Sequence, residues 1–330
     1  MKIAILDDYQ GVALKLADWS VLPADAQVSA FSDHWAGLDT IKEKLGTFEI
    51  VAAMRERTPF TRELLEVLPN LKLLVTTGMR NASIDLDAAT DLGILVCGTS
   101  GGGSSTAELA WGLILALLRH IPQESASIRQ GGWQTTIGTG LNGKVLGLLG
   151  LGNLGSRMAT IGNVFGMSVI AWSQNLTAER TAQFGASLVT KDELFAGSDI
   201  LSIHLKLSDR TRGLVGMREL SIMKPTAYLV NTSRGPIIDE TALLQTLQSH
   251  AIAGAGLDVY DQEPLPSKHP LRRLDNVIGT PHLGYVTEEA YKGFYAQSVE
   301  DILSYLSGQP VRVLNPAVLG KTRDVKSGGV

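Results

Sequence analysis

The chain has almost no cysteine: Cys97 is the single one among its 330 residues. A disulfide framework and a zinc site built on cysteines are therefore excluded, and we expect no metal. An excess of positive charge is also missing, since 29 lysines and arginines face 33 acidic residues, for a formal net charge of −4. No broad basic field is available for a nucleic-acid partner.

Long apolar runs are absent as well. The longest is Leu109–Leu118, which lies between Glu108 and Arg119. A membrane-spanning helix needs about 20 apolar residues, so this run is too short and no membrane partner is expected. The first residues, Met1–Asp8, contain a short apolar stretch followed at once by acids, which is not a secretory signal. We therefore expect a cytoplasmic protein.

Glycine, by contrast, is abundant, with 35 residues of 330, and nine of these fall between Gly131 and Gly155. Clustering without a period indicates specialised backbone rather than a fibrous or low-complexity chain. The length favours two domains, each large enough for its own core.

Short apolar segments alternate with helix-like ones along nearly the whole chain, which predicts an α/β fold with parallel sheets. The strands expected in the first part are Lys2–Leu6, Gln27–Phe31, Ile50–Met54, Leu71–Thr76 and Gly93–Val96. Six more are expected later, at Val145–Gly150, Ser168–Trp172, Ile200–Leu205, Ala227–Asn231, Ala253–Leu257 and Val277–Thr280. Six strands with intervening helices are the size of a complete dinucleotide-binding sheet.

The segments between these strands define the expected domain boundaries. Gly101–Gly103 is composed like a hinge, and the helix expected at Thr106–Arg119 is apolar nearly all round, so it should be buried between domains or subunits. After Gly284 the pattern becomes helical to about Leu306, then Val313–Pro316 is expected to be extended and the tail Lys321–Val330 disordered. We predict two Rossmann-like or flavodoxin-like domains, with residues 99–284 inserted as the cofactor domain into a substrate domain of residues 1–98 plus 285–330.

A glycine-rich loop, Gly150-Leu151-Gly152-Asn153-Leu154-Gly155, matches G-x-G-x-x-G between an expected strand and an expected helix. Gly150 permits the tight turn, Gly152 lets the backbone approach a pyrophosphate, and Gly155 lets helix and strand pack closely. Free N–H groups at the helix start, which include Asn153 and Leu154, favour phosphate oxygens. The loop therefore predicts a dinucleotide site.

The next strand bears on the choice between NAD and NADP. NAD-binding sheets usually place an acidic residue at its end to accept a hydrogen bond from the ribose. Here Ser173 takes that position, and the nearest downstream cation is Arg180. The sequence therefore leaves the choice between NAD and NADP open. It favours NAD slightly, because no arginine or lysine directly follows Ser173 to bind a 2′-phosphate.

Three later segments each end an expected strand with chemically useful residues: Asn231–Pro236, Gly256–Pro264 and Thr280–Gly284. Ligands of open α/β sheets bind at this carboxyl edge. With these segments the chain resembles the D-isomer-specific 2-hydroxyacid dehydrogenases from about Ile50 to Pro316. The family's catalytic arginine, glutamate and histidine fall on Arg234, Glu263 and His282.

The resemblance implies hydride transfer between a nicotinamide cofactor and a small 2-oxo or 2-hydroxy acid. A histidine can hold the proton that the carbonyl oxygen needs, a neighbouring carboxylate fixes its ring, and an arginine binds the substrate carboxylate with a planar fork of donors. The family's nicotinamide-side aspartate falls on Asp258. Other expected cofactor contacts are His204, Thr232, Ser233 and Gly284.

The family also binds the substrate carboxylate with backbone N–H groups of a loop in the first domain. Here that loop contains Gly78, Met79, Arg80 and Asn81, and Arg55 is a further candidate contact. Arg80 replaces the second glycine usual in the family's loop, so either an added cationic contact or a changed loop is possible.

Two other functions are compatible with this fold. Formate dehydrogenases typically carry glutamine where this chain has Glu263, which argues against formate as substrate. A non-enzymatic, dinucleotide-sensing corepressor would keep the fold, but no partner-binding extension is visible. The resemblance also implies a homodimer formed through the cofactor domains.

Overall fold

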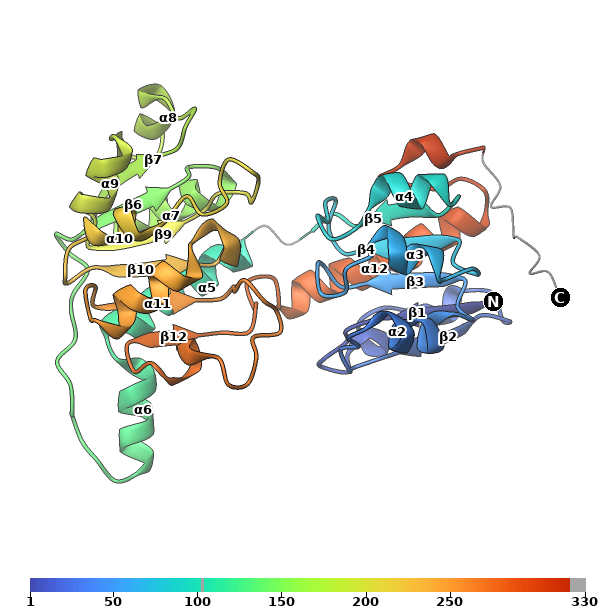
Figure 1. The fold of residues 1–330 in the computed structure, drawn as a ribbon, viewed down its shortest axis with the longest axis horizontal. Helices are drawn as coiled ribbons and strands as arrows, with labels where there is room; N and C mark the ends of the chain where they lie inside the picture. Colours follow the sequence, from blue (N-terminus) through green and yellow to red (C-terminus); the bar gives the residue numbers. More distant parts are fainter. Residues whose placement is uncertain (102–103, 321–330) are drawn as a thin grey trace. The chain divides into compact units, whose positions relative to one another are not determined.

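The computed structural model describes residues 1–101 and 104–320, which fall into two compact units (Figure 1). Unit 1 comprises residues 1–102 and 287–330, and unit 2 comprises residues 103–286. These boundaries lie a few residues beyond the expected ones. Apart from Gly101, the expected hinge and the expected disordered tail, Lys321–Val330, lie outside the described residues.

Unit 1 is built on a parallel five-stranded sheet with the order β2-β1-β3-β4-β5. Its strands are β1 (Lys2–Ile5), β2 (Gln27–Ala30), β3 (Ile50–Ala53), β4 (Leu73–Thr76) and β5 (Leu95–Gly98). Its helices are α1 (Ala13–Leu16), α2 (Leu38–Leu45), α3 (Arg62–Glu66), α4 (Leu86–Asp91) and α12 (Glu288–Leu306), with the 3-10 turns η1 (Trp19–Val21) and η4 (Pro316–Val318).

The sequence explains this architecture locally. Every residue of β3, β4 and β5 is buried, as expected for parallel strands that are covered on both faces. Side chains cap three of the helices: Thr61 accepts from the Leu64 N–H, Asp85 from the Ala88 N–H and Thr287 from the Ala290 N–H.

The chain returns to unit 1 after unit 2 and closes the edge of its sheet. Val313 forms an isolated antiparallel bridge with Cys97, and the Asn315 side chain accepts from the Val96 N–H at 2.8 Å. The expected extended segment Val313–Pro316 is thus only partly extended, because Pro316 already begins η4.

Unit 2 is built on a parallel seven-stranded sheet with the order β12-β11-β10-β9-β6-β7-β8. Its strands are β6 (Val145–Leu149), β7 (Ser168–Trp172), β8 (Ala186–Leu188), β9 (Ile200–Ile203), β10 (Tyr228–Asn231), β11 (Gly254–Leu257) and β12 (Val277–Gly279). Its helices are α5 (Ser105–Leu118), α6 (Ile121–Arg129), α7 (Asn153–Val164), α8 (Ala178–Ala182), α9 (Lys191–Gly197), α10 (Met217–Ser221) and α11 (Glu240–Gln248), with η2 (Gly235–Ile237) and η3 (Pro270–Arg273).

The prediction of six strands for this sheet was wrong by one. Strand β8 has three residues, and two of them, Ser187 and Leu188, are exposed. A short, exposed edge strand lacks the apolar run on which the prediction depended.

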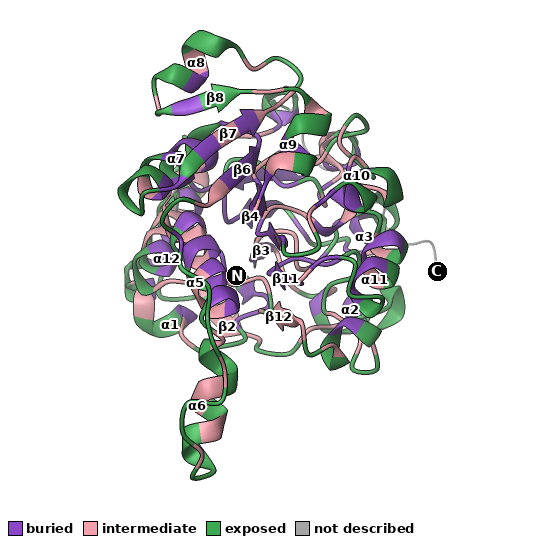
Figure 2. Ribbon diagram, turned by 90° about the vertical axis from the view of Figure 1, so that its left-hand side faces the viewer, coloured by how far each residue is buried: buried purple, intermediate pink, exposed green. Residues whose placement is uncertain are grey.

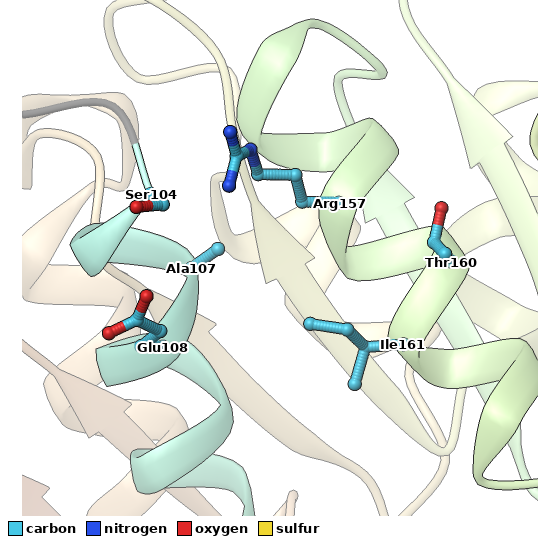
Figure 3. A pocket seen from close by; sticks show the side chains of 6 residues that line it. All are labelled: Ser104, Ala107, Glu108, Arg157, Thr160 and Ile161. Carbon is cyan, nitrogen blue, oxygen red and sulfur yellow. The ribbon is translucent and has the colours of Figure 1, made fainter.

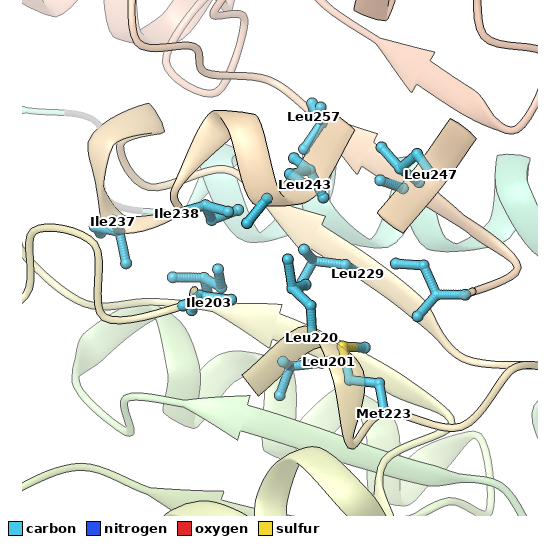
Figure 4. Close-up of a cluster of buried hydrophobic side chains, with 14 of the residues drawn as sticks. Leu201, Ile203, Leu220, Met223, Leu229, Ile237, Ile238, Leu243, Leu247 and Leu257 are labelled. Carbon is cyan, nitrogen blue, oxygen red and sulfur yellow. The ribbon is translucent and has the colours of Figure 1, made fainter. Parts of the chain in front are cut away.

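Helices cover both faces of the unit 2 sheet. On one face, Leu201, Leu229 and Leu257 from three adjacent strands pack with Leu243 and Leu247 of α11 (Figure 4). On the other, a second buried cluster joins strands β6 and β7 to α5 and α7. Figure 2 shows the strands largely buried and the outer helix surfaces exposed. Among the described residues, no helix is both long and apolar enough to cross a membrane.

A buried contact between Asp301 and Arg312 anchors the returning segment in unit 1. Asp301 of α12 is fully buried, and its Oδ1 lies 3.0 Å from Nε and 2.9 Å from Nη2 of Arg312. Its Oδ2 has no hydrogen-bond partner within residues 1–101 and 104–320. Burial raises the pKa of Asp301 to about 7, in spite of the neighbouring Arg312.

This raised pKa makes stability depend on pH. Between pH 5 and pH 7 the folded chain keeps a proton on Asp301 that the unfolded chain has lost, so stability falls as pH rises. We expect the free energy of unfolding of Asp301→Asn, measured by urea denaturation, to gain roughly 1–2 kcal/mol relative to wild type between those pH values. If the free energy of unfolding depends on pH in the same way for both proteins, Asp301 does not have the raised pKa.

Candidate active site

The glycine loop has the conformation that a phosphate site requires. Gly150 has a φ of +105°, and a Cβ there would lie 2.7 Å from the His204 carbonyl oxygen. A Cβ on Gly155 would lie 2.1 Å from the Gly150 carbonyl oxygen. By contrast, a Cβ on Gly152 would meet no described atom within 4 Å. Backbone packing therefore requires glycine at 150 and 155, while position 152 faces open space.

The loop leads directly into α7, whose first residues are Asn153 and Leu154. The N–H groups of a helix's first turn have no acceptor within the helix. Together with the helix dipole, they favour an anion beside the open position at Gly152.

Two unpartnered polar atoms lie at the same edge of the sheet. Thr232 follows β10 and is 5 % exposed, and its Oγ1 has no partner in the described part of the chain. His204 follows β9, and its Nδ1 is buried and equally without a described partner. Strands β6, β9 and β10 are neighbours, so these atoms and the glycine loop share one edge. Such atoms are typical of a ligand site. The glycine loop, the start of α7 and these two atoms together form a cradle that fits a dinucleotide.

His204 is held neutral in this setting. Its Nε2 lies 2.9 Å from Ser202 Oγ, and burial lowers its pKa to about 4. A neutral ring can be packed beneath the glycine loop without the cost of a buried charge.

The ribose position after β7 carries no strong charge. Ser173 follows Trp172 directly, and its carbonyl oxygen accepts from the Leu176 N–H at 3.1 Å. Arg180 is engaged locally, since it donates to Gln183 Oε1 at 2.9 Å and stacks over the Phe184 ring at 4.4 Å. The Arg180 side chain is therefore occupied within its own segment.

The central feature of the site is a histidine–carboxylate pair. His282 Nδ1 lies 2.5 Å from Glu263 Oε2, and Glu263 Oε1 accepts from the Tyr260 N–H at 2.9 Å. The His282 side chain is 20 % exposed, and the described residues give its Nε2 no hydrogen-bond partner. One ring nitrogen is therefore fixed, and the other is available to a ligand.

Asp258 holds the turn that carries His282. Its carboxylate, 0 % exposed, accepts from Thr280 Oγ1 at 2.6 Å, the Leu283 N–H at 2.7 Å and the Gly284 N–H at 2.9 Å. Its carbonyl oxygen accepts from the His282 N–H at 2.9 Å. Burial raises the pKa of the Asp258 carboxyl group.

These bonds maintain a conformation that histidine rarely adopts. His282 has a φ of +55°, in the left-handed region, which persists only where the surroundings enforce it. The turn is also fixed from α5, because the Gly284 carbonyl oxygen accepts from Ser105 Oγ at 2.8 Å and Thr106 Oγ1 at 2.9 Å.

Tyr260 is a residue that the sequence analysis missed. Its hydroxyl lies 3.1 Å from the carbonyl oxygens of both Leu257 and Thr280, so it joins the ends of β11 and β12. Burial raises its pKa to about 12. Two glycines make room for it: a Cβ on Gly279 would lie 2.7 Å from the hydroxyl, and one on Gly235 would lie 2.1 Å from the Tyr260 carbonyl carbon. An aromatic residue near Asp258, with glycine at the end of β12 and at the start of η2, was the available signal.

Arg234 lies on a turn that packs against the same tyrosine through Gly235. Asn231 fixes this turn, since its Nδ2 donates to the Arg234 carbonyl oxygen at 3.0 Å and its Oδ1 accepts from the Ser233 N–H at 3.0 Å. Ser233 Oγ donates to the Leu205 carbonyl oxygen, and Arg234 Nη1 donates to the Ser233 carbonyl oxygen at 2.7 Å. Arg234, Glu263 and His282 thus all lie at the carboxyl edge of the unit 2 sheet.

In unit 1 the expected substrate loop follows β4. Gly78 has a φ of +104°, and its N–H donates to Thr99 Oγ1 at 2.9 Å. Arg55 lies against this loop, with Nη1 at 3.2 Å from the Thr77 carbonyl oxygen, and Asn81 Nδ2 donates to the Arg55 carbonyl oxygen at 2.6 Å. Arg55, Gly78 and Asn81 are therefore together in unit 1, whereas the catalytic candidates belong to unit 2.

A separate surface pocket of about 210 Å³ lies in unit 2 between α5 and α7 (Figure 3). Its lining residues are Ser104, Ala107, Glu108, Arg157, Thr160 and Ile161. None of the expected catalytic residues lines it.

A dinucleotide cradle and a histidine–carboxylate pair on one sheet edge define a dinucleotide-dependent oxidoreductase. The family model described as D-isomer specific 2-hydroxyacid dehydrogenase, NAD binding domain, matches residues 111–284. The chain belongs to this family. Its relatives are oxidoreductases, which favours the enzymatic function over the corepressor alternative.

Two named relatives show how far the similarity extends. The glyoxylate reductase of Aeropyrum pernix is 39% identical over 268 residues, which cover 78% of this chain and 80% of that protein. The D-3-phosphoglycerate dehydrogenase of Archaeoglobus fulgidus is 38% identical over 78% of this chain but only 50% of its own length. The chain thus spans about half the length of that dehydrogenase.

Solved structures extend the similarity over both units. A phosphoglycerate oxidoreductase from Vibrio cholerae superposes with a TM-score of 0.89 at 38% identity, covering 93% of this chain and 99% of that one. The D-lactate dehydrogenase of Escherichia coli gives a TM-score of 0.82 at 25% identity, covering 95% and 100% of the two chains.

The glycine loop generates a prediction with a matched control. Gly152→Ala should weaken NADH binding at least about tenfold, because its Cβ takes space that the pyrophosphate needs, while the melting temperature stays unchanged. Gly155→Ala should instead lower the melting temperature, because its Cβ meets the Gly150 carbonyl oxygen. Fluorescence titration and thermal unfolding measure the two effects. Unchanged NADH binding by Gly152→Ala would disprove the assigned role of Gly152.

Proposed function

We propose that this protein reduces small 2-oxo acids to D-2-hydroxy acids with NADH or NADPH, and catalyses the reverse oxidation. The observation that carries the proposal is the bond between His282 Nδ1 and Glu263 Oε2 at 2.5 Å. It lies on the sheet that also holds the dinucleotide loop. A general acid beside a nicotinamide cradle is what carbonyl reduction requires.

Residues of this chain perform the proton transfer. A nicotinamide held in the cradle would supply the hydride that the C2 atom of the substrate accepts. His282 gives the proton on Nε2 to the carbonyl oxygen, which becomes the hydroxyl group of the product. Glu263 stabilises the ring through Nδ1, so that Nε2 keeps its direction during the transfer. In the oxidation, neutral His282 takes the hydroxyl proton back.

The proposed substrate contacts come from Arg234 and from backbone N–H groups of the loop after β4. In the proposed site, Arg234 binds the carboxylate beside the reacting carbonyl and polarises the carbonyl oxygen. The N–H groups of Met79 and Arg80 form no hydrogen bond within the described part of the chain, and Gly78 turns the loop. They are suited to a carboxylate group, as in the nests that bind anions elsewhere.

The dinucleotide is held by the residues of the cradle. Gly150, Gly152, Asn153, Leu154 and Gly155 are proposed to hold the pyrophosphate, and Ser173 the ribose. Around the nicotinamide half we propose His204, Thr232, Ser233, Asp258 and Gly284. Since Arg180, the nearest cation downstream of Ser173, is engaged by Gln183 and Phe184, we propose NAD as the preferred cofactor.

The proposal is tested by following NADH and NADPH oxidation with glyoxylate, hydroxypyruvate, pyruvate and 3-phosphohydroxypyruvate. Wild type should turn over at least one of them, with the higher kcat/KM for NADH. His282→Ala should lower kcat about 100-fold or more and leave the Kd for NADH within about twofold, because the ring moves a proton but does not build the cradle.

His250→Asn is the matched control, since His250 is exposed and has the same left-handed backbone as His282, with a φ of +52°. Its activity should equal that of wild type. Failure of wild type to turn over any 2-oxo acid, although it binds cofactor, would disprove the proposal. Loss of NADH binding by His282→Ala would show that His282 has a structural role instead.

We also propose that the protein is a homodimer, held by an arm of unit 2 that comprises residues 121–140. No residue of this arm is buried, and Figures 1 and 2 show α6 extending away from the rest of the unit. The arm nevertheless has a defined structure, because Glu124 accepts from Thr135 Oγ1 at 2.8 Å and from Thr136 Oγ1 at 2.7 Å.

Large apolar side chains lie on this arm. Ile128 is 57%, Trp133 75% and Ile137 95% exposed. Such a grouping on a projecting, ordered segment favours a protein partner, and a second copy of the chain offers the same surface in return.

The dimer is tested by sedimentation velocity of Trp133→Glu combined with Ile137→Glu. Wild type should sediment as a dimer and the double variant as a monomer with an unchanged far-UV spectrum, because the charges prevent burial of the arm. Leu14→Glu, at another exposed apolar position, should remain dimeric. A monomeric wild type, or a double variant that still dimerises, would contradict the proposal.

A further inference from the structure

The carboxyl edge of the unit 1 sheet carries three arginines within or beside two neighbouring loops: Arg55 and Arg57 after β3, and Arg80 after β4. Parallel strands present ligand sites at this edge. The three arginines differ in what they already contact, and this difference indicates which of them can bind a further group.

Arg57 is engaged inside unit 1. Its Nη1 donates to the Asp7 carbonyl oxygen at 2.6 Å, its Nη2 donates to the Tyr291 hydroxyl at 3.2 Å, and its guanidinium lies 4.3 Å from the centre of the Tyr9 ring. These contacts fasten the loop after β3 to α12 and to the loop after β1. The Arg57 guanidinium is therefore occupied by contacts within unit 1.

Arg55 organises the loop after β4. Its backbone N–H donates to Thr77 Oγ1 at 2.8 Å, its guanidinium donates to the Thr77 carbonyl oxygen, and Glu56 Oε2 lies 3.6 Å from its Nε. A Cβ on Gly78 would lie 2.1 Å from Arg55 Nη1, so the guanidinium occupies the space that glycine leaves. With a φ of +52°, Arg55 is held in a rare conformation by these bonds.

The Arg80 side chain makes no comparable contact in the described part of the chain. It is exposed, and within residues 1–101 and 104–320 it has no hydrogen-bond or ion-pair partner. Its backbone is fixed on both sides, by Gly78 and by Asn81, which is 9% exposed and donates to Thr76 Oγ1 at 2.9 Å. A rigid loop thus presents a free guanidinium where the family's loop usually has glycine.

We propose that Arg80 binds a second anionic group of the substrate, a terminal carboxylate or phosphate distal to the 2-oxo acid end. The inference rests on the proposed function, in which the loop's N–H groups bind the first carboxylate. Those N–H groups belong to the backbone, whereas the guanidinium lies at the end of a long side chain and reaches a more distant part of the same molecule. The substrate class is then 2-oxo acids that carry two anionic groups.

Matched substrate pairs test this directly, because each pair differs in the terminal group. The pairs are oxaloacetate with 2-oxobutanoate, 2-oxoglutarate with 2-oxopentanoate, and 3-phosphohydroxypyruvate with hydroxypyruvate. Wild type should prefer the doubly anionic member of at least one pair by about tenfold or more in kcat/KM. The preferred pair distinguishes a terminal carboxylate from a terminal phosphate.

Variants then assign the preference to Arg80. Arg80→Gln and Arg80→Gly should lower kcat/KM for the preferred dianion about 10- to 100-fold more than for its singly charged partner, mainly through KM. Arg80→Lys should restore part of the loss. Lys42→Gln, which removes an exposed charge from α2, should leave both members of the pair unchanged.

Activity with singly charged acids but no preference for any dianion would overturn this inference and leave the proposed function intact. Equal losses for both members of a pair would also overturn it, because Arg80 would then act on the shared carboxylate or on the loop. Turnover of glyoxylate or pyruvate but of none of the six acids would overturn this inference alone. No turnover of any 2-oxo acid would overturn the proposed function itself.

Discussion

The carboxylate of Asp258 has no exposure to solvent, and donors from Thr280, Leu283 and Gly284 hold both of its oxygens. Burial of this group is costly, and the three short bonds offset the cost. They also fix the turn in which His282 adopts left-handed backbone. The position of the proposed proton donor therefore depends on an acid that is itself inaccessible to substrate.

From this turn, contacts extend to the other catalytic candidates. Tyr260 joins the strand ends on either side of Asp258 through its hydroxyl, and its backbone N–H orients Glu263. Gly235 packs on the Tyr260 carbonyl carbon, which places the Arg234 turn against the same residue. Tyr260 thus orients Glu263 directly and lies against the turn that carries Arg234.

The fold class was predictable because buried parallel strands are continuous apolar runs, as in β3, β4 and β9. Strand β8 and helix α6 escaped prediction for the opposite reason: β8 is short and mostly exposed, and α6 has no buried residue. The order of Arg234, Glu263 and His282 could be taken from the resemblance, and the structure shows Glu263 and His282 in contact. The substrate role of Arg234 and the ribose contact of Ser173 stay predictions.

The roles of Asp258 and Tyr260 in positioning could not be predicted from the sequence. The contact of Asp258 with the nicotinamide stays a proposal, whereas its internal bonds depend on donors in a turn whose shape only the folded chain defines. The same holds for Arg55, whose guanidinium occupies the space beside Gly78, and both residues have positive φ angles.

The central claim, that His282 moves the proton in both directions, is tested most directly by the pH dependence of kcat/KM for reduction and for oxidation. The account predicts that reduction falls and oxidation rises with increasing pH, and that His282→Gln lowers both rates and abolishes this opposite dependence. An opposite dependence that persists in His282→Gln, or profiles that fall together in both directions, would contradict it.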